Sequence, residues 1–95
     1  MGNPFDVTGK VALVTGSSSG IGRASAKALA ANGARVAINF HSNQEGAEAT
    51  RAEIVAAGGT AITVKADVAK ASDVQALVEH TVKELGRDMR ILSGF

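Results

Sequence analysis

Short apolar runs alternate with stretches of helical periodicity along the chain. Three runs are typical of strands buried on both faces of a parallel sheet: Lys10–Thr15, Arg35–Phe40 and Ala61–Ala66. Between the first two runs, apolar side chains recur at helical spacing, which predicts a helix over Gly20–Asn32. Gly33 follows directly and suits the left-handed conformation that ends many helices.

Two further helices are predicted from capping signals. Ser42 with Glu45, and Ser72 with Gln75, have the spacing of a capping box, in which two side chains satisfy backbone N–H groups at the start of a helix. The expected inner faces of the two helices consist of Ala47, Thr50, Ile54 and Ala57, and of Val74, Leu77, Val78, Thr81, Val82 and Leu85.

Alternating strands and helices predict an α/β fold with a doubly wound parallel sheet. Right-handed crossovers should place the first two helices on one face of this sheet. Met89–Leu92 is a short run that contains an Arg, and it could begin a fourth strand. We therefore expect three strands, with a fourth as the alternative, and three helices.

Composition narrows the class of protein. The chain has 95 residues, enough for one modest core, and residues 1–95 are predicted to be a single domain. Ten Lys and Arg against nine Asp and Glu give a net charge of +1, which argues against a nucleic-acid partner. There is no Cys, the two His are far apart, and no apolar run approaches the roughly 20 residues of a membrane span. We expect a cytoplasmic protein with neither a metal site nor a membrane partner.

The candidate chemistry lies between the first strand and the first helix, in Thr15-Gly16-Ser17-Ser18-Ser19-Gly20-Ile21-Gly22. A helix N-terminus presents unpaired N–H groups and about half a positive charge, so it favours a phosphate. Gly16 permits a sharp turn, Gly20 lets the main chain approach a pyrophosphate, and Gly22 lets the helix lie close to the sheet. The alternative is a turn of small residues that binds no ligand.

These residues resemble the cofactor signature of the short-chain dehydrogenase/reductase superfamily, in the branch that includes 3-oxoacyl-carrier-protein reductases. The resemblance extends over about Asp6 to Gly86 and implies a partial Rossmann-type sheet that binds a dinucleotide cofactor. It implies that the pyrophosphate and the adenosine ribose contact Gly16, Ser18, Gly20, Ile21 and Gly22, and that the adenine contacts Asp67 and Val68. Asp67 has an alternative interpretation, as the acceptor of a turn after the third strand.

The preferred cofactor is NADP, with NAD as the alternative. An acid at the end of the second strand would bind the ribose 2′-OH of NAD and repel the 2′-phosphate of NADP. That place holds Phe40-His41-Ser42-Asn43, with no acid, and Arg23 follows the glycines. His41, Ser42 and Arg23 are therefore candidate phosphate contacts, although each also fits a solvated or capping role. Ser19 is a further candidate for a cofactor contact. It stands at a position where relatives that prefer NADP often carry a basic residue, which argues for the NAD alternative.

The chain departs from the family in its catalytic residues. The family's Asn-Asn-Ala-Gly, its catalytic Ser and its Tyr-x-x-x-Lys pair have no counterparts, and the sequence contains no Tyr. We therefore predict no catalytic residues and expect a truncated cofactor-binding half of an oxidoreductase, inactive alone. Two alternatives remain: a non-enzymatic nucleotide-binding module, which could complement a separate catalytic chain, and a fragment that binds nothing. Self-association through residues 89–92 at an open sheet edge is a further expectation.

Overall fold

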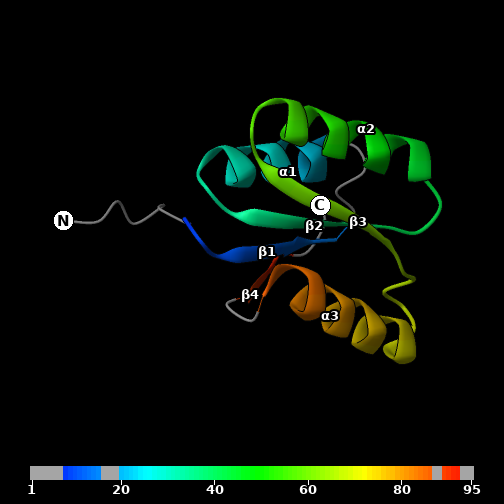
Figure 1. Ribbon diagram of the computed structural model, residues 1–95. Helices are drawn as coiled ribbons and strands as arrows, with labels where there is room; N and C mark the ends of the chain where they lie inside the picture. Colours follow the sequence, from blue (N-terminus) through cyan, green and yellow to red (C-terminus); the bar gives the residue numbers. More distant parts are fainter. Residues whose placement is uncertain (1–7, 16–19, 87–88, 93–95) are drawn as a thin grey trace.

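The computed structural model describes residues 8–15, 20–86 and 89–92, which form a parallel sheet with helices on both faces (Figure 1). The elements follow in the order β1 (Val11–Val14), α1 (Gly20–Ala31), β2 (Arg35–Phe40), α2 (Gln44–Ala56), β3 (Thr60–Lys65), α3 (Ala71–Leu85) and β4 (Met89–Leu92). The strand order of the described sheet is β3-β2-β1-β4. The predicted α/β fold is confirmed, and the fourth strand of the alternative interpretation is present as β4.

Parallel pairing fixes the sheet around β1. Val14 lies opposite Ile38 of β2 and Leu92 of β4, and β2 continues the register with Phe40 opposite Lys65 of β3. All three pairings are parallel, so the carboxyl ends of the four strands lie along one edge. The described part of the chain places no strand on the outer side of β4, and self-association through that edge stays a prediction.

The two faces of the sheet are covered by different helices. Helices α1 and α2 lie side by side on one face and α3 lies on the other (Figure 1). This confirms the arrangement that was expected from right-handed crossovers. Each face has its own buried cluster. The first consists of Ala12, Val14, Ala26, Ala34, Val36, Ile38, Phe40, Ala47, Ile54 and Ala61, and the second of Val11, Leu13, Ala37, Ala66, Leu77 and Leu85. Strand β1 contributes alternate residues to both clusters, which explains its continuous apolar sequence.

Both predicted capping boxes are wrong in register. Helix α2 is capped by Asn43, whose Oδ1 accepts a hydrogen bond from the Gly46 N–H at 3.0 Å, one residue beyond Ser42. Asn is as good an N-cap as Ser, so adjacent candidates cannot be separated by propensity. Helix α3 follows Lys70, which makes no side-chain cap, and Ser72 lies inside the helix.

The predicted helix faces are largely correct. Ala47, Thr50 and Ile54 are buried on α2, and Leu77 is among the buried residues of α3. Two small departures occur at helix ends. Ala57 is an exposed C-cap, and Val74 in the first turn of α3 is 37% exposed.

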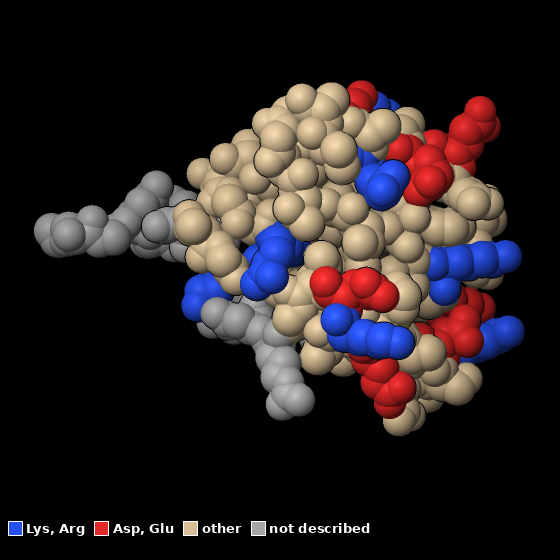
Figure 2. All heavy atoms as spheres, in the orientation of Figure 1, with Lys and Arg blue, Asp and Glu red and all other residues tan. Residues whose placement is uncertain are grey.

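On the face that Figure 2 shows, Lys and Arg side chains are interspersed with Asp and Glu. No helix in the described residues is long and apolar enough to cross a membrane.

We predict that the sheet core dominates the free energy of unfolding. Val36 is fully buried in β2, whereas Val55 on α2 is 49% exposed. Val36→Ala should lower the free energy of unfolding by about 2 kcal/mol, because two buried methyl groups are lost and a cavity remains. The matched Val55→Ala should change it by less than about 0.5 kcal/mol. Urea denaturation measures both, and equal losses would contradict this description of the core.

Candidate functional site

Three helices begin at the edge where the parallel strands end. Helix α1 follows β1, α2 follows β2, and α3 follows β3, so each helix N-terminus lies near the carboxyl edge of the sheet (Figure 1). Unpaired N–H groups at helix N-termini attract anions. In open α/β sheets, ligands bind outside this edge where the strand order reverses, which here is between β1 and β4.

Gly20 is the first residue of α1 and adopts a left-handed backbone conformation. Its φ is +61°, a conformation that L-residues rarely adopt, and a Cβ built on it would meet no atom of the described residues within 4 Å. Gly22 is buried in the same turn. Ile21 lies between them in the helix, and Gly16, Ser18 and Ser19 lie outside the described residues.

The structure brings together the candidates that follow β2 and β3. His41 Nε2 lies 3.8 Å from Asp67 Oδ2, with the two side chains 69% and 29% exposed. Ser42 is exposed next to His41, and Val68 is 51% exposed next to Asp67. These four candidates therefore flank one stretch of the carboxyl edge, although they come from two separate junctions.

Asp67 also forms the turn that its alternative interpretation described. Its Oδ1 accepts a hydrogen bond from the Ala69 N–H at 3.0 Å, which is the local pattern of an Asx turn. The Lys70 N–H donates to the Asp67 carbonyl at 2.9 Å and closes the turn. The second carboxylate oxygen is the one that faces His41, so the turn leaves it at the edge of the sheet.

The Arg23 side chain of α1 forms an ion pair with a residue of α2. Its guanidinium donates to Glu53, and Lys27 Nζ lies 3.1 Å from the other oxygen of the same carboxylate. Contacts with Lys27 and with Arg23 hold the pKa of the Glu53 carboxyl below its ordinary value. The charge of Arg23 is thus partly compensated, and its side chain links α1 to α2. A phosphate contact by Arg23 stays a prediction.

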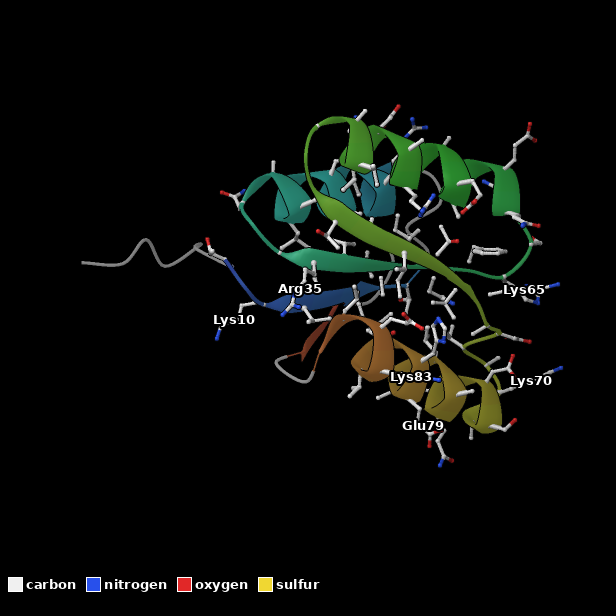
Figure 3. The ribbon with its side chains drawn as sticks, viewed as in Figure 1. Lys10, Arg35, Lys65, Lys70, Glu79 and Lys83 are labelled. Atoms are coloured by element: carbon white, nitrogen blue, oxygen red, sulfur yellow. The ribbon has the colours of Figure 1, made fainter. Side chains whose placement is uncertain are left out.

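Two exposed lysines, which sequence reasoning did not single out, extend from the carboxyl edge. Lys65 is the last residue of β3, and Lys70 is the N-cap of α3 (Figure 3). Both add positive charge beside the helix N-termini, where the acids Glu45, Asp67 and Asp73 also lie. Among the described residues, no three His, Asp or Glu side chains are grouped as metal ligands.

Asn39 and Asp73 are two further polar residues that sequence reasoning did not place at the site. Asn39 is 3% exposed in β2, and its Nδ2 donates to the carbonyl oxygens of Val64 and Ala66 at 3.3 and 3.2 Å. Asp73 lies in the first turn of α3, and its Oδ2 accepts from the Asp67 N–H at 2.9 Å. An Asn inside an apolar strand was the available signal for the first residue, because a buried amide requires partners.

Residues 10–92 match the family model described as short chain dehydrogenase, so the chain belongs to the short-chain dehydrogenase family. An uncharacterized oxidoreductase of Methylorubrum extorquens is 54% identical over 79 residues, which are 83% of this chain and 32% of that protein. A 3-oxoacyl-[acyl-carrier-protein] reductase of Synechocystis is 48% identical, over 85% of this chain and 33% of that protein. The family resemblance inferred from the glycines is confirmed.

Solved structures agree with this assignment. A dehydrogenase/reductase from Sinorhizobium meliloti superposes with a TM-score of 0.90 at 39% identity, and the match covers 94% of this chain and 35% of that one. The chain thus spans about a third of the length of this structure and of the two relatives above. A short-chain dehydrogenase/reductase homolog of Bacillus subtilis, 46% identical, is matched over 75% of its own length and 86% of this chain.

Proposed function

We propose that this chain binds NADP(H) at the carboxyl edge of its sheet, as the adenosine-side part of a short-chain dehydrogenase/reductase. The observation that carries the proposal is the start of α1, where Gly20 has a positive φ and no atom of the described residues lies within 4 Å of the place a Cβ would take. A pyrophosphate could approach the backbone N–H groups there without meeting a side chain of this residue. Family membership supports a nicotinamide dinucleotide as the ligand.

The described residues fit such a cofactor. Three helix N-termini lie at one edge and favour negative charge there. Lys65 and Lys70 add positive charge at this edge, among the acids Glu45, Asp67 and Asp73. Asp67 and Val68 would contact the adenine, since one carboxylate oxygen of Asp67 is not used by its turn and Val68 is exposed. Gly16, Ser18, Ser19, Ile21 and Gly22 would complete the contacts with the pyrophosphate and the ribose.

Preference for NADP over NAD is supported by the end of β2. The strand ends at Phe40, which is followed by His41 and Ser42, so no carboxylate stands there to receive a ribose 2′-OH or to repel a 2′-phosphate. His41 and Ser42 are exposed and carry neutral or cationic donors, and Arg23 lies on the neighbouring helix. NAD remains the alternative ligand.

A bound NADPH would supply a hydride for the reduction of a carbonyl, and the chain's own part is to bind and orient the adenosine half. In this family the proton moves through a Tyr whose pKa a neighbouring Lys lowers. The sequence contains no Tyr, and the serines near Gly20 are assigned to the phosphate. We infer that the 95-residue chain is inactive by itself and acts in the cytoplasm as a cofactor-binding part of an oxidoreductase.

The glycine at the start of α1 gives a direct test of the binding site. Gly20→Ala should weaken NADPH binding at least tenfold, about 1.4 kcal/mol, because a methyl group would stand where the phosphate approaches. Gly58→Ala is a matched control, since Gly58 has φ +89°, lies just after the far end of α2, and has no described atom within 4 Å of its Cβ position. Both variants should lose about 1–2 kcal/mol of stability from the left-handed conformation. Titration calorimetry that showed the same affinity for both variants would contradict the proposed site.

Cofactor choice is tested at Ser42. The unaltered chain should bind NADPH more tightly than NADH, and Ser42→Asp should reduce that preference about tenfold because a carboxylate repels the 2′-phosphate. The substitution suits its position, since an acid before the N-cap of α2 favours the helix. Gln75→Glu on the exposed surface of α3 adds the same charge elsewhere and should leave the ratio unchanged. Tighter binding of NADH by the unaltered chain would overturn the NADP assignment.

Turnover provides a separate test. The purified 95-residue chain, mixed with NADPH and a 3-oxoacyl thioester, should consume no more NADPH than buffer does, because no Tyr is available as acid or base. NADPH absorbance followed over time measures this rate. Consumption that rises in proportion to the concentration of the chain would refute the proposal of inactivity, although not that of cofactor binding.

A further inference from the structure

A single peptide group after β3 is held from both sides by side chains of other elements. Its carbonyl oxygen, on Ala66, accepts a hydrogen bond from Asn39 Nδ2 of β2 at 3.2 Å. Its N–H, on Asp67, donates to Asp73 Oδ2 of α3 at 2.9 Å. Both atoms belong to the same planar unit, so these two bonds fix its orientation relative to the sheet and to α3.

The backbone on either side of this peptide is also tied down. The Ala66 N–H donates to the Phe40 carbonyl at 2.9 Å, which continues the pairing of β2 with β3 by one step. Asn39 Nδ2 donates to the Val64 carbonyl as well, at 3.3 Å. The chain therefore leaves the sheet in a defined direction at Asp67.

The arrangement is notable because an apolar residue would suit the position of Asn39. Asn39 is 3% exposed, and its neighbours Ala37 and Ala66 belong to the apolar cluster beneath α3. A polar side chain here requires hydrogen bonds, and it finds them at the end of β3. Asp73 likewise reaches back beyond the N-cap Lys70 to Asp67.

The direction of the Asp67 side chain follows from the orientation of this peptide. One carboxylate oxygen accepts from the Ala69 N–H, and the other lies 3.8 Å from His41 Nε2 at the carboxyl edge. Rotation of the Ala66–Asp67 peptide would turn the Cα–Cβ bond of Asp67 and move that second oxygen. Asn39 and Asp73 thus act on Asp67 without standing at the edge themselves.

We propose that Asn39 and Asp73 are positioning residues that clamp the Ala66–Asp67 peptide so that Asp67 can accept a hydrogen bond from the exocyclic amino group of an adenine. This inference rests on the proposed cofactor function. If the clamp positions Asp67, it affects how well the chain discriminates between purine bases. This discrimination can be measured separately from the affinity for the cofactor. Hypoxanthine carries a carbonyl oxygen in place of the amino group of adenine, and the Asp67 carboxylate would repel that oxygen because both groups are acceptors.

A purely structural role would have different consequences. Asp73 is the acid in the first turn of α3, where any negative charge stabilises the helix by interacting favourably with the helix dipole. Loss of that charge would weaken the fold and lower affinity for both bases alike. Asp73→Asn separates the two roles, because it removes the charge and keeps an oxygen acceptor for the Asp67 N–H.

The experiment compares NADPH with its reduced hypoxanthine analogue by titration calorimetry on the 95-residue chain. The unaltered chain should bind NADPH at least about tenfold more tightly than the hypoxanthine analogue. Asp73→Ala should weaken the binding of NADPH, so that this preference falls to less than about threefold. Asp73→Asn should keep most of the preference. Asn39→Val, a residue that suits a buried strand, should act like Asp73→Ala, and circular dichroism confirms that each variant is folded.

The matched control is Ser72→Ala, which alters an exposed neighbour in the same turn and should leave the preference unchanged. If Asp73→Ala keeps the unaltered preference, or if Asp73→Asn loses it to the same extent, the clamp is refuted. If the unaltered chain binds both nucleotides equally, Asp67 does not recognise the base and the inference fails, while cofactor binding stands. If it binds neither nucleotide, the proposed function itself is overturned.

Discussion

Parallel pairing of β1 with strands on both of its sides is the constraint on which the rest of the structure depends. Residues 11–14 are at most 3% exposed, because helices cover both faces of the sheet. A parallel strand must be followed by a crossover, and right-handed crossovers bring each helix back over the sheet. Every helix therefore starts at the carboxyl edge, and the candidate binding groups are gathered there by topology.

The chemistry of the edge comes from three successive strand-to-helix junctions. The first contributes Gly20 and the start of α1, the second contributes His41, and the third contributes Asp67. These residues are separated by more than twenty positions in sequence, yet parallel registers of β1 with β2 and of β2 with β3 align the junctions. A change in register would move the side chains of a whole strand to the other face. Core packing and the geometry of the site are thus two results of the same pairing.

Much of the fold could be predicted because its signals are local. Apolar runs located the strands, and Gly33 and Gly58, both with positive φ, mark the ends of α1 and α2. The caps of α2 and α3 could not be assigned correctly, since Ser42 and Asn43 have similar propensities and α3 begins without a side-chain cap.

The parts of the site that could not be predicted depend on tertiary contacts. Arg23 follows the glycines in sequence, but its partner Glu53 lies on another helix. Asn39 meets the end of β3 only after the crossover through α2 is complete, so its polar character inside an apolar strand signals a need for partners and does not identify them. Asp73 lies in the first turn of α3, where an acid also fits a capping or solvated role, so its contact with the Asp67 N–H could not be assigned from the sequence. Asp67 was identified through family resemblance, and the structure adds the contacts that hold it.

The proposed function requires that a phosphorylated dinucleotide bind at the carboxyl edge through the backbone at the start of α1. Amide chemical shifts of the isotope-labelled chain, recorded while NADPH is added, test this claim most directly. Binding at this edge should give saturable shifts at Gly20, Ile21 and Gly22 and at Asp67 and Val68, with none at the amino edge around Arg35. Shifts confined to the amino edge, or no saturable shift at α1, would contradict it.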